Sequence, residues 1–158
     1  MREIASCDIF NIECDCIVIP TNGIIKANGD AVMGAGLAKT CDLKYGVSRN
    51  LGMCLKHGNH VYNLGYYDGH YVCSFPTKHH WRDKSDMNLI VSSANELISH
   101  ANINNWNKVI LPAVGCGLGG LNYEDVRNTL AKILDDRFII IRKSTPTVRS
   151  AYFNDSIY

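Results

Sequence analysis

The 158-residue sequence predicts a three-layer α/β/α domain with a mixed, largely parallel central sheet. Residues 14–20, 108–112 and 138–141 are apolar almost throughout, which is typical of strands buried on both faces. Segments with helical periodicity separate these strands along the chain, and this alternation favours parallel pairing. An Asp68-Gly69 pair between two further strand-like segments predicts one antiparallel hairpin.

The first half of the chain opens with a short predicted strand at residues 3–7. A helix is expected before Gly46, because glycine readily takes the left-handed conformation that ends many helices. Apolar residues recur there at helical spacing: Leu37, Ala38, Cys41 and Tyr45. Residues 47–56 form a weaker helical segment. The two strands of the hairpin are expected at 60–64 and 71–75.

Two helices are predicted in the second half. Ser85 can cap the first of them, and Asn122 with Asp125 three residues later resembles a capping box at the second. The apolar face of the first helix comprises Met87, Ile90, Ala94 and Leu97. The apolar face of the second comprises Val126, Leu130, Ile133 and Leu134.

Composition indicates an ordinary globular protein, with 46% hydrophobic and 20% charged residues. We expect a single domain, residues 1–158, with a core at about 1–142 and a polar tail at 143–158. No apolar run approaches the roughly 18 residues of a membrane span, so no membrane partner is expected. Seven cysteines after a start without an apolar leader favour free thiols in a reducing, cytoplasmic compartment. A monomer is expected. A net charge of +1 means that any binding of nucleic acid requires a local patch.

Two glycine-bearing segments, residues 29–38 and 115–121, each follow a predicted strand and lead into a helix. A helix start presents free backbone N–H groups and the positive end of the helix dipole, so two such loops could hold a diphosphate from both sides. Neither segment matches the P-loop or the dinucleotide fingerprint. Taken alone, the loops are explained equally well as tight connections.

No metal or cofactor is predicted. Residues 54–60 include Cys54, His57 and His60, but the chain has no paired Cys-x-x-Cys sets and no zinc-protease motif. Cys116 lies in the second glycine loop without an identifiable base beside it, so we interpret it as a small residue that fits the loop rather than as a nucleophile.

Four motifs together resemble those of the macrodomain family, whose α/β fold binds ADP-ribose. They are Cys7-Asp8-Ile9-Phe10, Pro20-Thr21-Asn22-Gly23, Met33-Gly34-Ala35-Gly36-Leu37-Ala38 and Pro112-Ala113-Val114-Gly115-Cys116-Gly117-Leu118-Gly119-Gly120-Leu121. They stand in the family's order and cover roughly residues 1–142.

The resemblance implies a role for each motif. Asp8 would accept a hydrogen bond from the adenine amino group beside the backbone N–H of Ile9, and Asn22 would lie near the distal ribose. The alternatives are a turn-forming Asp8 and a simple Asn22-Gly23 turn. The remaining residues expected to contact ADP-ribose, as ligand or product, are Thr21, Met33, Gly34, Ala35, Gly36, Leu37, Gly115, Cys116, Gly117, Leu118 and Gly119.

Within the family, the sequence is similar to the branch that contains terminal ADP-ribose protein glycohydrolase and the antitoxin macrodomains that remove ADP-ribose from DNA. The residues that carry this likeness include Phe75-Pro76-Thr77-Lys78, whose lysine position is catalytic in that branch. Lys78 would attack the anomeric carbon of the distal ribose or stabilise charge as the glycosidic bond breaks. Without the resemblance, a lysine at a strand end is a solvated charge.

Two departures from the family narrow the expected function. Ala38 stands where some macrodomain hydrolases carry an aspartate, and Gly119 stands where the protein-directed relative carries another. The sequence is therefore more similar to the DNA-directed type. We expect a hydrolase that removes ADP-ribose from nucleic acid or protein. The alternatives are an ADP-ribose-1''-phosphate phosphatase and a non-catalytic binder of ADP-ribose or a related NAD-derived nucleotide.

A polar segment follows Lys78 directly and could form the rim of the site. It contains His79, His80, Trp81 and Arg82. Donors interleaved with an aromatic ring could hold a phosphate backbone and stack a base, and either histidine could act as a general acid or base. A polar loop before a helix explains the same residues equally well.

Overall fold

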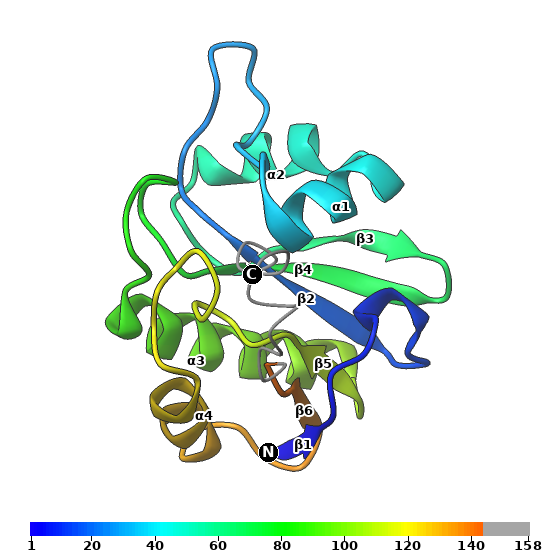
Figure 1. Ribbon diagram of the computed structural model, residues 1–158. Helices are drawn as coiled ribbons and strands as arrows, with labels where there is room; N and C mark the ends of the chain where they lie inside the picture. The colour runs from blue at the N-terminus through cyan, green and yellow to red at the C-terminus, as the bar shows by residue number, and fades with distance from the viewer. Residues whose placement is uncertain (144–158) are drawn as a thin grey trace.

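A computed structural model describes residues 1–143, so the predicted tail lies outside the described residues apart from its first residue. Within the described range, a six-stranded sheet has α1 and α2 on one face and α3 and α4 on the other (Figure 1). The strands are β1 (Arg2–Ile4), β2 (Cys16–Thr21), β3 (Asn63–Tyr67), β4 (His70–Pro76), β5 (Val109–Leu111) and β6 (Phe138–Ile141). The helices are α1 (Gly36–Tyr45), α2 (Ser48–Leu55), α3 (Met87–Asn104) and α4 (Tyr123–Ala131), with a 3₁₀ turn at Ile9–Asn11. The predicted three-layer architecture is confirmed.

The strand order β1-β6-β5-β2-β4-β3 places β2 between β5 and β4. Every neighbouring pair is parallel except β3 with β4. Parallel strands bring their carboxyl ends to one edge of the sheet, and the loops after β2, β4 and β5 gather at that edge (Figure 1). This edge is where ligands bind in open α/β sheets.

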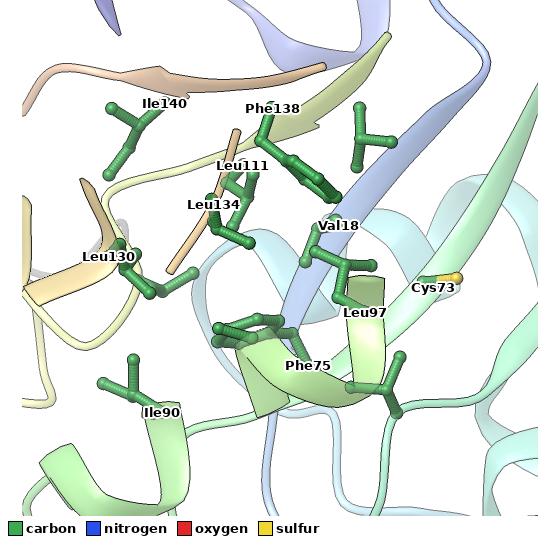
Figure 2. Packing of buried hydrophobic residues seen from close by; sticks show 14 of the residues in the cluster. Val18, Cys73, Phe75, Ile90, Leu97, Leu111, Leu130, Leu134, Phe138 and Ile140 are labelled. Carbon is green, nitrogen blue, oxygen red and sulfur yellow. The ribbon is translucent and has the colours of Figure 1, made fainter. Parts of the chain in front are cut away.

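The sheet separates two hydrophobic cores, which explains why its strands are apolar on both faces. In β2, Cys16 and Val18 pack toward α3 and α4, whereas Ile17 and Ile19 pack toward α1 and α2, and all four are fully buried. Figure 2 shows the first core, in which side chains from the sheet converge on those of α3 and α4. Its labelled members are Val18, Cys73, Phe75, Ile90, Leu97, Leu111, Leu130, Leu134, Phe138 and Ile140.

Turn and cap residues take the predicted conformations at three positions. Gly46 ends α1 with a φ of 66°, in the left-handed region. The hairpin residues Asp68 and Gly69 have φ values of 52° and 88°. Asn122 caps α4, because its side chain accepts a hydrogen bond from the Asp125 backbone N–H at 3.2 Å.

The cap of α3 differs from the prediction. Asp86, not Ser85, is the N-cap, and its carboxylate accepts a hydrogen bond from the Asn88 N–H at 2.9 Å. The Ser85 N–H instead donates to the Gly119 carbonyl at 3.0 Å. A tertiary hydrogen bond thus moves the start of the helix by one residue.

Element boundaries also differ from the expected ones, with the largest shifts in β1, β3 and α4. β1 ends at Ile4 rather than at residue 7, since its partner strand β6 offers it only three paired positions. β3 starts at Asn63, because the preceding Tyr62 N–H donates to the Ser74 side chain instead of a strand carbonyl. α4 ends at Ala131, so Ile133 and Leu134 pack from beyond the helix.

All seven cysteines are free thiols. Among residues 1–143, no helix combines the length and apolar character that crossing a membrane requires.

Alanine substitutions at a buried and at an exposed position of α3 test the packing of the core. Leu97 is fully buried and Ile103 is 79% exposed. We expect Leu97→Ala to lower the free energy of unfolding by about 2–5 kcal/mol, because it removes apolar contacts and leaves a cavity. Ile103→Ala on the same helix is the control, with an expected change within about 0.5 kcal/mol. Urea denaturation measures both, and equal losses would contradict the packing described.

Candidate functional site

A cavity of about 490 Å³ opens at the carboxyl ends of β2 and β4. Its wall combines the end of β2, the loop into α1, the segment after β4 and one residue of the loop after β5. The lining residues are Pro20, Thr21, Asn22, Val32, Met33, Gly34, Ala35, Gly36, Leu37, Ala38, Thr77, Lys78, Trp81 and Leu118. The structure therefore brings together most of the first glycine loop, Lys78 and part of the predicted rim.

The start of α1 lies on this wall without a side-chain cap. Its N-cap residue is Ala35, which makes no capping hydrogen bond, whereas α3 and α4 are capped by Asp86 and Asn122. The N–H groups of the first helical turn have no carbonyl four residues earlier within the helix. Free N–H donors at the positive end of a helix dipole favour an anion over a cation or a neutral group.

Lys78 is the only ionisable side chain among the described residues that line the cavity. None of the ion pairs within residues 1–143 includes it. The wall thus carries a positive side chain and a positive helix end without a lining carboxylate, a combination that favours a negatively charged ligand.

Hydrogen bonds to the backbone carbonyl groups hold the segment around Lys78 in place. Four consecutive carbonyls accept hydrogen bonds from three other segments of the chain. The bonds are Ser93 Oγ to Pro76 at 2.8 Å, Asp86 N–H to Thr77 at 2.8 Å, Asn59 Nδ2 to Lys78 at 3.0 Å and Gly23 N–H to His79 at 3.1 Å. A catalytic or binding side chain on so constrained a backbone is pre-organised, since only its own rotamers remain free.

Asn22 and Gly23 form the turn that supports this segment. The Asn22 side chain donates to the Val32 carbonyl at 3.1 Å and accepts from the Ile24 N–H at 3.0 Å. A Cβ on Gly23 would lie 3.0 Å from Asn59 Cγ. Asn22 therefore stabilises the Asn22-Gly23 turn, as the simpler interpretation holds, and it also lines the cavity. Its contact with a ribose stays a prediction.

Thr21 supplies an unpaired polar group at the cavity. The residue is 5% exposed and lines the wall, and its Oγ1 has no hydrogen-bond partner in the described part of the chain. Buried hydroxyl groups normally have a partner. A polar ligand in the cavity would provide one.

The second glycine loop meets the cavity only through Leu118. Packing explains two of its glycines: a Cβ on Gly115 would lie 2.9 Å from Ile90 Cδ1, and a Cβ on Gly119 would overlap the Ser85 hydroxyl. Contacts of Gly115, Gly117 and Gly119 with a ligand stay predictions.

Cys116 is buried, and its thiol donates to the Val114 carbonyl. Burial raises the pKa of this thiol to about 11, against the opposing effect of Lys143, whose amine donates to the Cys116 carbonyl. The thiol is protonated near neutral pH, which supports its interpretation as a small packing residue.

Asp8 and Ile9 lie outside the residues that line the cavity. Asp8 is exposed, and its carboxylate accepts hydrogen bonds from the Phe10 N–H at 3.0 Å and the Asn11 side chain at 3.2 Å. It therefore caps the 3₁₀ turn, while Ile9 is buried against the α1 side of the sheet. Recognition of adenine by these residues stays a prediction.

The predicted rim divides into two parts. Trp81 lines the cavity, and the Arg82 guanidinium lies over its ring at 4.6 Å. His80 lies beside the same ring, with 5.3 Å between ring centroids. His79 points elsewhere, because its Nε2 lies 3.2 Å from Asp86 Oδ2.

The sequence analysis did not identify Asn59 and Ser93, whose side chains hold the segment around Lys78. Asn59 donates to the Lys78 carbonyl, 19 residues away in the sequence, and Ser93 donates to the Pro76 carbonyl, 17 residues away. Each uses a side chain to bind a main-chain carbonyl, and such a pairing has no local sequence signature. Within residues 1–143 there is no group of three or more His, Cys, Asp or Glu side chains placed to hold a metal ion.

The fold and the site define an α/β/α protein whose cavity, at the carboxyl edge of its sheet, has a lysine and an uncapped helix start on its wall. A sequence model of the Macro domain matches residues 26–130, and the chain belongs to the macrodomain family. The family predicted from the motifs is thereby confirmed.

Curated relatives include proteins named DNA ADP-ribosyl glycohydrolase. The one from Mycobacterium tuberculosis is 38% identical over 71 residues, which is 44% of this chain and 20% of the relative. The one from Thermus aquaticus is 31% identical over 65 residues, which is 41% of this chain and 18% of the relative. The matched region thus spans about a fifth of the length of these relatives.

Solved structures show the same fold. The macrodomain of Mycobacterium tuberculosis DarG aligns with a TM-score of 0.75 and 27% identity, over 91% of this chain and 99% of that chain. Thermosipho africanus DarTG in complex with ADP-ribose aligns with a TM-score of 0.72 and 22% identity, over 92% of this chain and 43% of that chain.

Glycines of the two loops should respond differently to alanine. We expect Gly119→Ala to lower the free energy of unfolding by about 1–3 kcal/mol, since the added methyl collides with Ser85 and with the Gly115 carbonyl. Gly34→Ala is the matched control, because nothing lies within 4 Å of its added Cβ. Its expected change is within about 0.5 kcal/mol. Thermal and urea unfolding measure the difference, and equal destabilisation would refute it.

The His79–Asp86 contact predicts a pH dependence of stability. The hydrogen bond from His79 is the main cause that lowers the pKa of the Asp86 carboxyl. The stabilisation from this carboxylate is therefore present above its unfolded pKa of about 3.9 and is lost as the pH falls through the lower folded value. Asp86→Asn keeps a capping side chain without the charge. We expect the wild type to exceed this variant in unfolding free energy at about pH 5, and the difference to shrink toward about pH 2. A difference independent of pH would contradict the assignment.

Proposed function

We propose that this macrodomain is a hydrolase that removes ADP-ribose from modified DNA, with Lys78 acting beside the distal ribose. The observation that carries the proposal is that one cavity wall contains both the uncapped start of α1 and Lys78 as its only ionisable side chain. The names of the curated relatives support DNA as the carrier of the modification. Modified protein is the alternative carrier.

The ligand would lie across the carboxyl edge of the sheet. Its diphosphate would receive hydrogen bonds from the backbone at Gly34, Ala35 and Gly36, where the α1 dipole adds to the attraction. The unpaired Thr21 hydroxyl would find its partner in the bound ligand. Asp8 would accept from the adenine amino group, beside the Ile9 backbone.

Lys78 would act at the anomeric carbon of the distal ribose. The ammonium group would first lose a proton to solvent, and the neutral amine would then attack that carbon while the bond to the linked base breaks with its electron pair on the base. The base takes a proton from solvent, and water finally adds to the anomeric carbon and releases the ribose from the lysine. Alternatively, the ammonium group would stabilise charge that develops as the bond breaks. A mechanism based on two carboxylates lacks its groups, since no acidic residue lines the cavity among the described residues.

The same lack of a lining acid also favours a second candidate, a protein that binds ADP-ribose or a related NAD-derived nucleotide without turnover. The positive wall is sufficient to hold a diphosphate. Ala38 occupies the wall where some relatives in the family carry an aspartate. Only turnover distinguishes this non-catalytic binder, called the reader below, from the hydrolase.

The test offers the protein three substrates: ADP-ribosylated single-stranded DNA, ADP-ribosylated protein and ADP-ribose-1''-phosphate. We expect release of ADP-ribose from DNA, reduced about a hundredfold or more in Lys78→Ala. Lys78→Arg keeps the positive charge, but its guanidinium is always protonated and cannot attack carbon. Activity retained by the arginine variant would assign an electrostatic role, and activity lost would assign nucleophilic attack. Chromatography measures the product, and calorimetry with ADP-ribose checks that each variant still binds.

Other outcomes decide between the rivals. Phosphate release from ADP-ribose-1''-phosphate alone would identify a phosphatase. Tight binding of ADP-ribose without any product would identify the reader. Failure to bind ADP-ribose would contradict the proposed function in every form.

A further inference from the structure

Two large apolar side chains stand half-exposed at the mouth of the cavity. Trp81 is 45% exposed and Leu118 is 51% exposed, and both line the wall. Of the six large hydrophobic residues exposed in the described part of the chain, only these two do so. Scattered exposed apolar residues are ordinary, but two at the mouth of one cavity indicate a contact with a ligand.

The fold holds these two residues on connected loops. Trp81 follows β4 and Leu118 follows β5, and these strands flank β2, whose end forms part of the cavity wall. The two loops are joined where the Ser85 N–H donates to the Gly119 carbonyl at 3.0 Å. Both side chains therefore belong to one cavity wall, on loops that a backbone hydrogen bond joins.

The Trp81 ring is held by its neighbours on the same loop. The Arg82 guanidinium lies 4.6 Å from the ring, and the Arg82 N–H donates to His80 Nδ1 at 3.0 Å. The His80 ring is tilted by 31° to the indole. A ring held by neighbours on its own loop loses little rotamer freedom when a planar group stacks on it.

We infer that Trp81 and Leu118 form a clamp for the nucleobase to which ADP-ribose is attached, an inference that rests on the proposed function. The anomeric carbon beside Lys78 carries the linked group, and Trp81 is only three residues further along the chain. A planar base with two apolar faces suits an indole on one side and a leucine on the other. A base held in this way is unpaired, so the clamp selects single-stranded nucleic acid.

The test measures binding rather than turnover. In a Lys78→Ala background, calorimetry gives the Kd for free ADP-ribose and for a single-stranded oligonucleotide with ADP-ribose on one base. We expect the oligonucleotide to bind more tightly than ADP-ribose, and Trp81→Ala to weaken only the oligonucleotide, by about fivefold or more. Trp81→Phe should restore most of the affinity, and Leu118→Ala should weaken the oligonucleotide in the same way. Tyr66→Ala and Ile103→Ala, at exposed positions outside the cavity, are the matched controls.

Three results would overturn the clamp. The first is that Trp81→Ala leaves both Kd values unchanged. The second is that this variant weakens the binding of ADP-ribose and of the oligonucleotide equally. The third is that the oligonucleotide keeps its affinity for the protein after a complementary strand has paired with it. Because no turnover is needed, a wild type that hydrolyses none of its substrates refutes the proposed hydrolase while the clamp is still decided by the Kd values.

Discussion

The parallel pairing of β2 with β4 on one side and β5 on the other is the constraint on which the site depends. Six paired positions join β2 to β4, so the end of β2 and the start of the Lys78 segment lie at the same level. The alternating burial of β2 in two cores prevents a shift by one residue, which would exchange its two faces. The position of the β2 end relative to the Lys78 segment is therefore set by the sheet rather than by the loops.

Rigidity at this edge comes from main-chain carbonyls held by distant donors, and it has a consequence for chemistry. The Ser85–Gly119 contact leaves no room for a side chain at position 119, so a carboxylate there would require a different residue 85 and a different loop. The absence of a carboxylate at position 119 thus follows from the packing of the whole loop, and replacing Gly119 alone would not restore one. Lys78 is thus the only ionisable side chain among the described residues that line the cavity.

Much of the fold was predictable because burial on both faces gives β2, β5 and β6 an unmistakable apolar sequence. The choice between Ser85 and Asp86 as a cap was not, since either side chain can cap a helix and a tertiary hydrogen bond decides. For the site, composition and spacing alone indicated only an anion held between the two glycine loops; Lys78 was predicted from the resemblance to a family. The support of Asn59 for Lys78 was invisible, because it joins residues that the fold alone brings together.

The bare start of α1 has a further meaning for the protein as a whole. Only Cys41 of this helix is fully buried, and among residues 1–143 no side chain caps its first turn. An anion seated there does what Asp86 and Asn122 do for their own helices. A ligand that binds at this helix start in the folded protein alone would therefore also stabilise the α1 layer against unfolding.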